Sequence, residues 1–150
     1  MAVRDYVSKR SNIIEALVSE LKNINGAGQF LTDLNNNVVG RLLFWDEIDD
    51  FPAVNLNAGS ESREYQGGGF KDRYLSVTIR VYVQEEDAQT KLNEVMEDIE
   101  TVIENNSNLQ YTDKLNTLYN VHQMSVVSID TDEGVLEPLG VGEMLIEVRY

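Results

Sequence analysis

Two segments of the chain place apolar residues at the three- and four-residue spacing of a helix with one buried face. The first helix is expected to start at Asn12 or, alternatively, at Asp5, and to end at the Asn25-Gly26 pair. The second is expected to start after Asp87, a natural N-cap, and to end at Asn105-Asn106. The apolar stripes are Ile13, Ile14, Leu17, Val18 and Leu21 in the first helix, and Leu92, Val95, Met96, Ile99, Val102 and Ile103 in the second.

Residues 74–84 alternate between apolar and polar side chains, which predicts a half-buried strand. Its apolar positions are Leu75, Val77, Ile79, Val81 and Val83. Weaker patterns predict five further strands, over residues 38–45, 51–59, 60–66, 121–130 and 141–149. Residues 46–50 and 131–140 are expected to form turns, and residues 111–119 a partly helical connection.

This order of elements predicts an α+β fold in which two helices pack on one face of a mostly antiparallel sheet. No repeat or long linker divides the chain, so residues 1–150 are expected to form one domain. The sequence has no cysteine, no signal-peptide pattern at its N-terminus and no apolar run of membrane-spanning length. We expect a soluble, intracellular protein.

The net charge of −14 argues against nonspecific nucleic-acid binding, because the 12 Lys and Arg residues are spread along the chain. The charge fits a surface for a basic partner, or the wall of a channel through which DNA passes without binding. Half of it lies between Glu85 and Glu104, where eight acidic residues and one lysine occur. This acidic helix is interpreted as a solvated face or as a partner surface, with Glu94, Glu97, Asp98, Glu100 and Glu104 as its candidate residues.

Patterns for catalysis or metal binding are weak. Residues 130–134, DTDEG, are similar to the opening of an EF-hand loop, but Val135 and Val141 stand where that loop needs glycine and glutamate. Residues 46–50, DEIDD, are interpreted as a solvated turn. His122 is the only histidine and has no nucleophile pattern near it. We expect no enzymatic activity, no cofactor and no metal site; an enzyme that uses these acidic residues with a metal is the alternative.

Residues 64–75, EYQGGGFKDRYL, combine three glycines with basic residues ahead of the best strand. They are no P-loop, because a strand rather than a helix follows. The gap between strands, Gly67–Asp72, is too long for a tight hairpin, and consecutive glycines disfavour a fixed geometry. We predict a long, mobile β-hairpin that becomes ordered against a partner, with a solvent loop as the alternative. Its candidate interface residues are Arg63, Gln66, Gly67, Gly68, Gly69, Phe70, Lys71, Asp72 and Arg73.

Three consecutive segments together resemble the tail terminator, or tail completion, proteins of long-tailed bacteriophages. They are FPAVNLNAGSESREY (residues 51–65), then, after the glycine-bearing gap, RYLSVTIRVYVQ (residues 73–84), and a helix that begins EEDAQTKLNEVMEDIE (residues 85–100). The resemblance is sharp over Phe51–Ile103, and the element order agrees over residues 1–150.

The resemblance implies a structural virion protein that is assembled in the host cytoplasm and forms a ring of six subunits. Such a ring caps the head-proximal end of the tail tube, stops its polymerisation and presents the surface that joins the head. Its partners are then copies of itself, the tail tube protein and the head–tail connector, while DNA passes through without specific binding. The family's long hairpin matches Ser62–Tyr74 and reaches toward the tube or a neighbour. A neck protein and a monomeric adaptor domain are the alternative interpretations.

Overall fold

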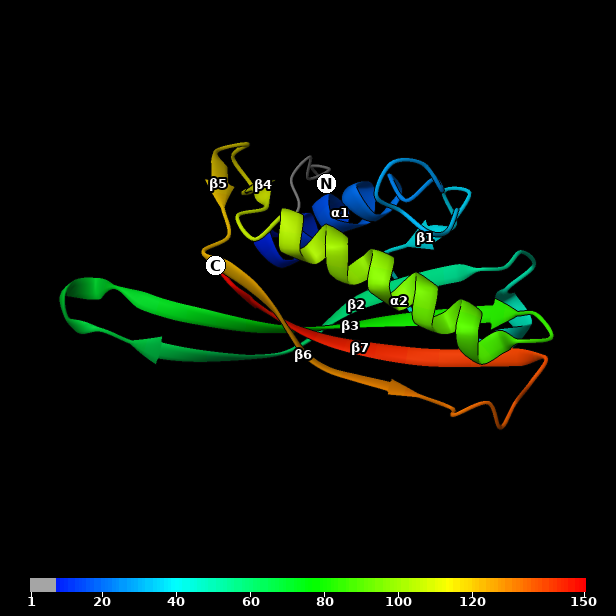
Figure 1. Ribbon diagram of the computed structural model, residues 1–150. Helices are drawn as coiled ribbons and strands as arrows, with labels where there is room; N and C mark the ends of the chain where they lie inside the picture. The colour runs from blue at the N-terminus through cyan, green and yellow to red at the C-terminus, as the bar shows by residue number, and fades with distance from the viewer. Residues whose placement is uncertain (1–7) are drawn as a thin grey trace, which may run out of the picture.

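The computed structural model describes residues 8–150, and Figure 1 shows an elongated sheet with both helices on one of its faces. Five strands pair in the order β1-β2-β3-β7-β6, and β4 and β5 form a separate hairpin. Only the β1–β2 pair is parallel among the described strands. The expected α+β fold is confirmed. The elements are α1 (Lys9–Leu21), β1 (Val38–Val39), η1 (Trp45–Glu47), β2 (Ala53–Tyr65), η2 (Gly67–Gly69), β3 (Lys71–Gln84), α2 (Ala88–Asn105), β4 (Gln110–Thr112), β5 (Leu118–Asn120), β6 (Gln123–Thr131) and β7 (Leu139–Arg149).

Helix α1 starts earlier than expected from Asn12, because Ser8 caps it. The Ser8 hydroxyl accepts a hydrogen bond from the backbone N–H of Ser11 at 3.2 Å. The alternative start, Asp5, lies outside the described residues. The helix ends at Leu21, before the Asn-Gly pair that was expected to terminate it. All five apolar residues of its stripe are buried, so the predicted face is confirmed.

Helix α2 begins after Asp87, as expected, and the Asp87 carboxylate accepts from the backbone N–H of Thr90 at 3.2 Å. Its apolar stripe is buried against the sheet. The helix crosses β7 where a side chain would not fit. A Cβ on Gly142 would overlap the Met96 methyl group and lie 3.1 Å from Leu92 Cδ1. Glycine at this position lets the helix approach the strand closely.

Strand β3 is the centre of the sheet, with β2 on one side and β7 on the other. Its predicted apolar face is confirmed, since all five of those residues are at most 1% exposed. The corresponding positions on β7 are Met144, Ile146 and Val148. These side chains and the two helical stripes form one continuous hydrophobic core. Burial of large apolar side chains, at roughly 1.5–3 kcal/mol each, is what fixes the helices on this face.

The strands expected over residues 51–59 and 60–66 form one continuous strand, β2. A β-bulge keeps them in register with β3, because Gly59 and Ser60 together face Ser76 alone. The strands expected over residues 121–130 and 141–149 are confirmed as β6 and β7 with slightly shifted ends.

The apolar run of residues 38–45 is not a strand over its length, because only Val38 and Val39 pair with β2. After them the chain turns toward the face of the sheet that the helices leave open. The Trp45 ring packs edge-on against Tyr82, with centroids 4.6 Å apart, and the Tyr82 hydroxyl donates to the Leu43 carbonyl at 3.2 Å. After Val39, residues of this segment therefore pack over the open face of the sheet and do not pair as a strand.

Residues 111–119 were expected to be partly helical, and this prediction was wrong. They form the β4–β5 hairpin. The Asp113 carboxylate accepts from the backbone N–H groups of Leu115 and Thr117 at 2.8 and 2.9 Å, and Asn116 adopts a positive φ of 61°. A short polar side chain that holds its own turn in this way competes with helix formation.

Asp98 was expected on the acidic surface of α2, and this prediction was wrong. The residue is 1% exposed. Its carboxylate accepts from the backbone N–H of Leu31 at 2.9 Å and of Thr32 at 2.8 Å, and from the Thr32 hydroxyl at 2.5 Å. Asp98 therefore ties the loop after α1 to α2. A buried charge is tolerated there because several donors satisfy it.

We predict that Asp98→Asn lowers the free energy of unfolding by about 2–3 kcal/mol, because the amide replaces an acceptor oxygen with a donor that faces other donors. Glu97→Gln is the matched control, since Glu97 is the exposed neighbour on the same helix. Urea unfolding should show a change within about 0.5 kcal/mol for the control. Equal stability of the two variants would contradict the role assigned to Asp98.

Candidate functional site

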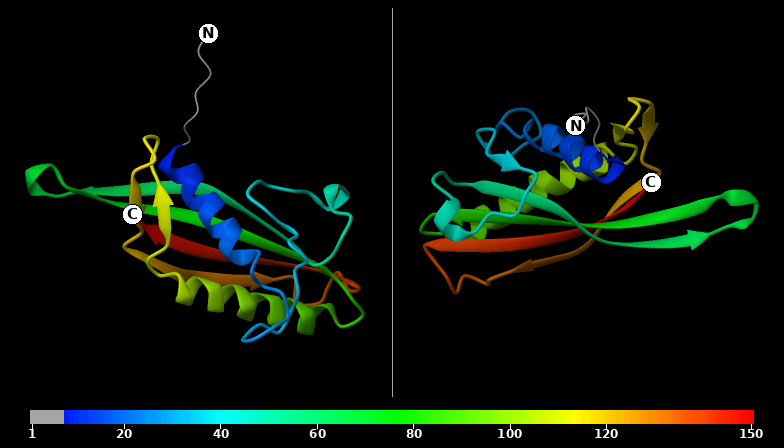
Figure 2. Two further views of the ribbon diagram at one scale, coloured as in Figure 1. Left: turned by 90° about the horizontal axis from the view of Figure 1, so that it is seen from above. Right: turned by 180° about the vertical axis from the view of Figure 1, so that it is seen from behind.

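Beyond the sheet, β2 and β3 continue as a two-stranded hairpin that projects from one end of the molecule (Figure 1), and Figure 2 shows it from above and from behind. Pairing between β3 and β7 ends at Tyr74 and Arg149. Pairing between β3 and β2 continues to Tyr65 and Lys71. The long hairpin expected around residues 62–74 is therefore present and has a defined register, while its mobility stays a prediction.

The turn of the hairpin is shorter than the sequence indicated, because residues 71–73 belong to β3 and only Gln66–Phe70 connect the strands. The Gln66 backbone N–H donates to the Phe70 carbonyl at 2.7 Å. Gly68 and Gly69 adopt positive φ angles of 77° and 85°. Residues that carry a side chain rarely adopt a positive φ, so the geometry of the turn explains the glycines at these positions.

The hairpin tip, residues 65–71, presents two large aromatic side chains to solvent. Tyr65 and Phe70 are each 73% exposed. The Lys71 ammonium lies 5.9 Å from the centre of the Tyr65 ring, which places one positive charge beside them. Phe70 and Lys71 were candidate interface residues, whereas Tyr65 was missed. The alternation over residues 60–66 was the signal for it, since Tyr65 is the large aromatic residue of that run.

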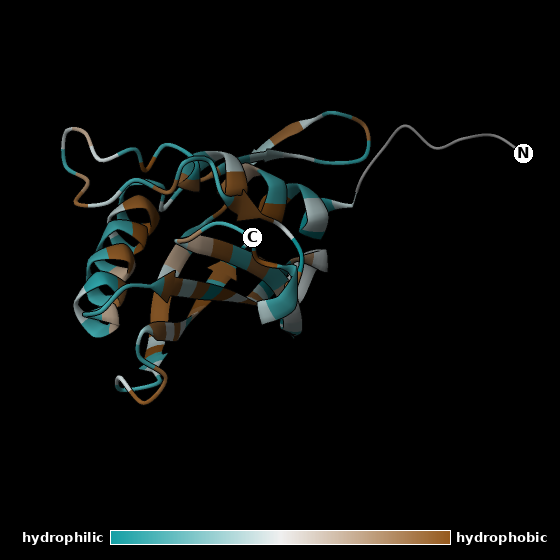
Figure 3. Ribbon diagram, turned by 90° about the vertical axis from the view of Figure 1, so that its right-hand side faces the viewer, coloured by the Kyte–Doolittle hydropathy of each residue, from teal (hydrophilic) through white to brown (hydrophobic). Residues whose placement is uncertain are grey.

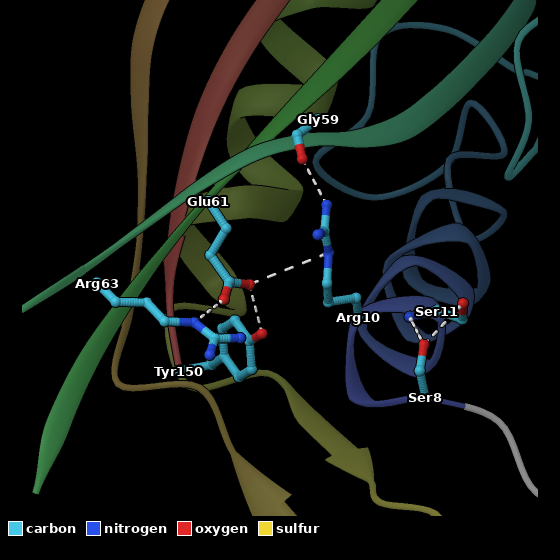
Figure 4. A network of polar contacts seen from close by, with 7 residues as sticks. All are labelled: Ser8, Arg10, Ser11, Gly59, Glu61, Arg63 and Tyr150. Atoms are coloured by element: carbon cyan, nitrogen blue, oxygen red, sulfur yellow. Dashed lines mark hydrogen bonds and ion pairs between the residues drawn. The ribbon is translucent and has the colours of Figure 1, made fainter.

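The base of the hairpin is braced by Glu61, which follows the β-bulge (Figure 4). Its carboxylate accepts from the Tyr150 hydroxyl at 2.5 Å and from Arg63 Nε at 2.6 Å, and it lies 4.0 Å from Arg10 Nε. Arg10 also donates to the carbonyl of Gly59 within the bulge. The Glu61 side chain is 6% exposed. The network joins α1, β2 and the residue that follows β7 at the point where the hairpin leaves the sheet.

A second set of contacts holds the other strand of the hairpin. Arg149 Nη2 lies 2.7 Å from the Asp72 carboxylate, and Gln66 Nε2 donates to the same group at 3.3 Å. The Arg73 guanidinium lies 5.2 Å from the centre of the Tyr150 ring. Arg63, Asp72 and Arg73 were predicted to contact a partner, but the structure places them in contacts within the chain.

The brace shifts the pKa values of the groups that form it. Burial of Glu61 raises its pKa, but hydrogen bonds from Tyr150 and Arg63 and the charges of Arg63 and Arg10 outweigh it, so the net pKa is lowered. Burial of the Tyr150 hydroxyl and its hydrogen bond to Glu61 raise the pKa of that group to about 12. Both shifts favour the pair in which Glu61 is ionised and Tyr150 is protonated.

The other predicted surface, on α2, is reduced by the burial of Asp98. Glu97 and Glu104 are exposed, and Glu94 and Glu100 are half-buried. These four residues lie on the side of α2 that faces away from the core, where either a solvated face or a partner surface is consistent with their exposure.

A larger acidic surface lies at the end of the sheet opposite the hairpin, which Figure 3 faces. The antiparallel pairing brings three chain segments to this end: the turn of residues 46–50 before β2, residues 85–87 after β3, and residues 130–137 between β6 and β7. We call this region the acidic end. In the sequence these three segments are far apart, and only the strand pairing brings them together. Within residues 8–150 no group of His, Asp or Glu side chains has an arrangement that could hold a metal ion.

The open face of the sheet has a shallow groove at the acidic end. Its apolar part consists of Trp45, Tyr82 and Val141. Arg80 crosses its floor, with Nε 2.7 Å from the Glu143 carboxylate, and Asp130 lies at the margin. The groove thus combines aromatic surface with more carboxylates than cations, a composition suited to protein contacts and lacking a nucleophile–base arrangement.

The profile of one family, described as the bacteriophage tail tube terminator protein, matches residues 7–150. The chain belongs to this family. The match extends over both helices, the sheet and the hairpin.

The tail tube terminator protein p142 of Escherichia phage T5 is 34% identical over 149 residues, covering 94% of this chain and 92% of the relative. A solved structure titled as the virion of a native gene transfer agent particle has a similar fold. The TM-score is 0.58 at 8% identity, and the comparison covers 94% of this chain and 96% of that one.

Members of this family are structural proteins of the phage tail, so the chain is a tail terminator of the virion and not an enzyme. The alternative of a metal-dependent enzyme is thereby excluded, and the resemblance noted from the sequence is confirmed. No helix within residues 8–150 is long and apolar enough to cross a membrane.

We predict that Tyr150→Phe lowers stability at pH 7 by about 1.5–3 kcal/mol, the worth of a hydrogen bond to a charged group. Because the Tyr150 pKa is raised from 10.0 to about 12 by folding, the advantage of the wild type should be complete below pH 10 and decline as the pH rises to 12. Because the Glu61 pKa is lowered, the advantage should also be lost as the pH falls below the usual carboxylate range. Urea unfolding across pH measures both limits.

Tyr119→Phe is the control for this series, since the Tyr119 side chain is 39% exposed and lies on β5, outside the brace. Its stability should follow that of the wild type at every pH. A Tyr150→Phe deficit that persists undiminished at pH 12 would contradict the brace.

Proposed function

We propose that six copies of this terminator form a ring that caps the head-proximal end of the tail tube, stops tube polymerisation and provides the surface for the head–tail connector. The number six comes from the resemblance of the sequence to the family. The observation that supports capping most strongly is the braced hairpin with its exposed aromatic tip.

A hairpin of this form is suited to docking because much of its ordering cost is met before it binds. Its strands are in register, the Glu61 ion pair fixes its base, and the Asp72 ion pair ties its second strand to Arg149. Preorganised segments lose less conformational entropy on association than loops that fold as they bind. The exposed Tyr65 and Phe70 then supply the large, rigid side chains that dominate the energy of protein interfaces.

Capping follows from the asymmetry of the terminator. Tube growth requires that each added ring present the same acceptor surface as the one before it. A ring of terminator subunits that binds the tube through one side and presents a different surface on the other side does not offer that acceptor. The acidic character of the chain also suits a conduit, because subunits with a net charge of −14 each do not hold DNA phosphates by attraction.

We predict that Tyr65→Ser with Phe70→Ser reduces the affinity for tail tube ends by about tenfold or more, because it removes both aromatic anchors. Both residues are solvent-exposed, so the stability of the variant should change by less than about 0.5 kcal/mol per site. Electron micrographs of purified tail tubes mixed with the protein give the fraction of capped ends and the length distribution of tubes grown in its presence.

Leu115→Ser with Leu118→Ser is the matched control, since these side chains in the β4–β5 hairpin are 74% and 61% exposed. The control should cap tubes as the wild type does. Capping by the tip variant at wild-type concentrations would show that the hairpin tip does not bind the tube end or assemble the ring. Wild-type protein that binds the connector and ignores tube ends would favour a neck protein instead.

A further inference from the structure

We propose that the groove at the acidic end of the sheet receives the hairpin tip of a second copy of this chain. The inference rests on the proposed ring and names the acceptor surface for the hairpin, so that adjacent subunits join head to tail.

The groove lies on the face of the sheet that the helices leave open. Trp45 and Val141 are half-buried there, and Tyr82 is buried beneath Trp45 at 6% exposure. The Trp45 ring stands edge-on to the Tyr82 ring, so a third ring can pack on the part of Trp45 that stays exposed.

The hairpin tip has the complementary chemistry. Phe70 and Tyr65 supply exposed rings, and Lys71 supplies a cation beside them. The groove supplies apolar surface and three carboxylates, Asp130, Asp132 and Glu143, against the single cation of Arg80. A tip that places Phe70 against Trp45 and Val141 brings Lys71 toward these carboxylates.

The two ends of the molecule also differ in charge. The hairpin end gathers half of the 12 basic residues of the chain, and Arg10, Arg63 and Arg149 among them pair with Glu61 and Asp72. The six are Lys9, Arg10, Arg63, Lys71, Arg73 and Arg149. The acidic end gathers the turns that hold residues 46–50, 85–87 and 130–137. Association of unlike ends is favoured over association of like ends, which gives the contact its direction.

A copy cannot place its tip in its own groove. Strand β3 runs between them, and the eleven residue-to-residue steps from Lys71 to Tyr82 span roughly 36 Å at the rise of a β-strand. The contact is therefore between molecules and joins unlike surfaces. Contacts of this kind repeat from copy to copy and produce a closed ring when the rotation between neighbours divides the circle evenly.

The absence of cysteine from the chain allows a direct test by disulfide trapping. One chain carries Phe70→Cys, a second carries Val141→Cys, and the two are mixed under oxidising conditions. Because a disulfide needs Cα atoms within about 7 Å, only a tip seated in the groove brings these positions together efficiently. We expect the mixed dimer to form at least about tenfold faster than the dimer of Phe70→Cys with Leu115→Cys, a control position that is 74% exposed and lies outside the groove. Tyr65→Cys with Asp130→Cys provides a second pair that does not alter the apolar groove.

Cross-linking of both pairs at the rate of the control would overturn the inference. The wild-type protein is tested for tube capping in parallel. If it caps tubes while neither pair cross-links, the groove is not the acceptor and the proposed function stands. If the pairs cross-link and the wild type does not cap tubes, the copy-to-copy contact is supported and the proposed function fails.

Discussion

The pairing of β3 along its whole length is the constraint on which the rest of the structure depends. Within the sheet β3 is held by β2 and β7, and beyond Tyr74 it continues with β2 alone, so sheet and hairpin are one piece. A slip of one residue would turn the buried face of β3 toward solvent, which fixes the register strongly. The same register places Glu61 opposite Leu75, within reach of Tyr150. Core packing thus determines where the hairpin points.

The parts of the fold that the sequence predicted are those with a strong local period. The stripe of α2 and the alternation of residues 74–84 each specify an element and its buried face. The strand predicted over residues 38–45 was mostly wrong, because an apolar run does not indicate whether it pairs as a strand or covers another surface. Here Trp45 covers Tyr82. The partly helical connection predicted over residues 111–119 was wrong, because the turn held by Asp113 outweighed a weak helical pattern.

The position of the candidate site in the chain was predictable, but the contacts of its residues with the rest of the chain were not. Three consecutive glycines marked the hairpin turn, but Glu61 and Arg73 contact Tyr150, which is remote in sequence. Asp98 looked like its acidic neighbours, and only the approach of Thr32 distinguishes it. The acidic end was visible as separate acidic turns, and strand pairing alone brings them together. The acidic surface of α2 stays a prediction, reduced by the burial of Asp98.

In the proposed assembly the terminator is a closed ring on one end of the tube, with subunits joined through hairpin and sheet. Cryo-electron microscopy of tail tubes capped with the purified protein tests this arrangement. We expect one ring of six subunits at a single end of each tube, with every hairpin tip in contact with the next subunit or the tube. Protein bound along the tube wall, or a ring whose hairpins project freely into solvent, would contradict it.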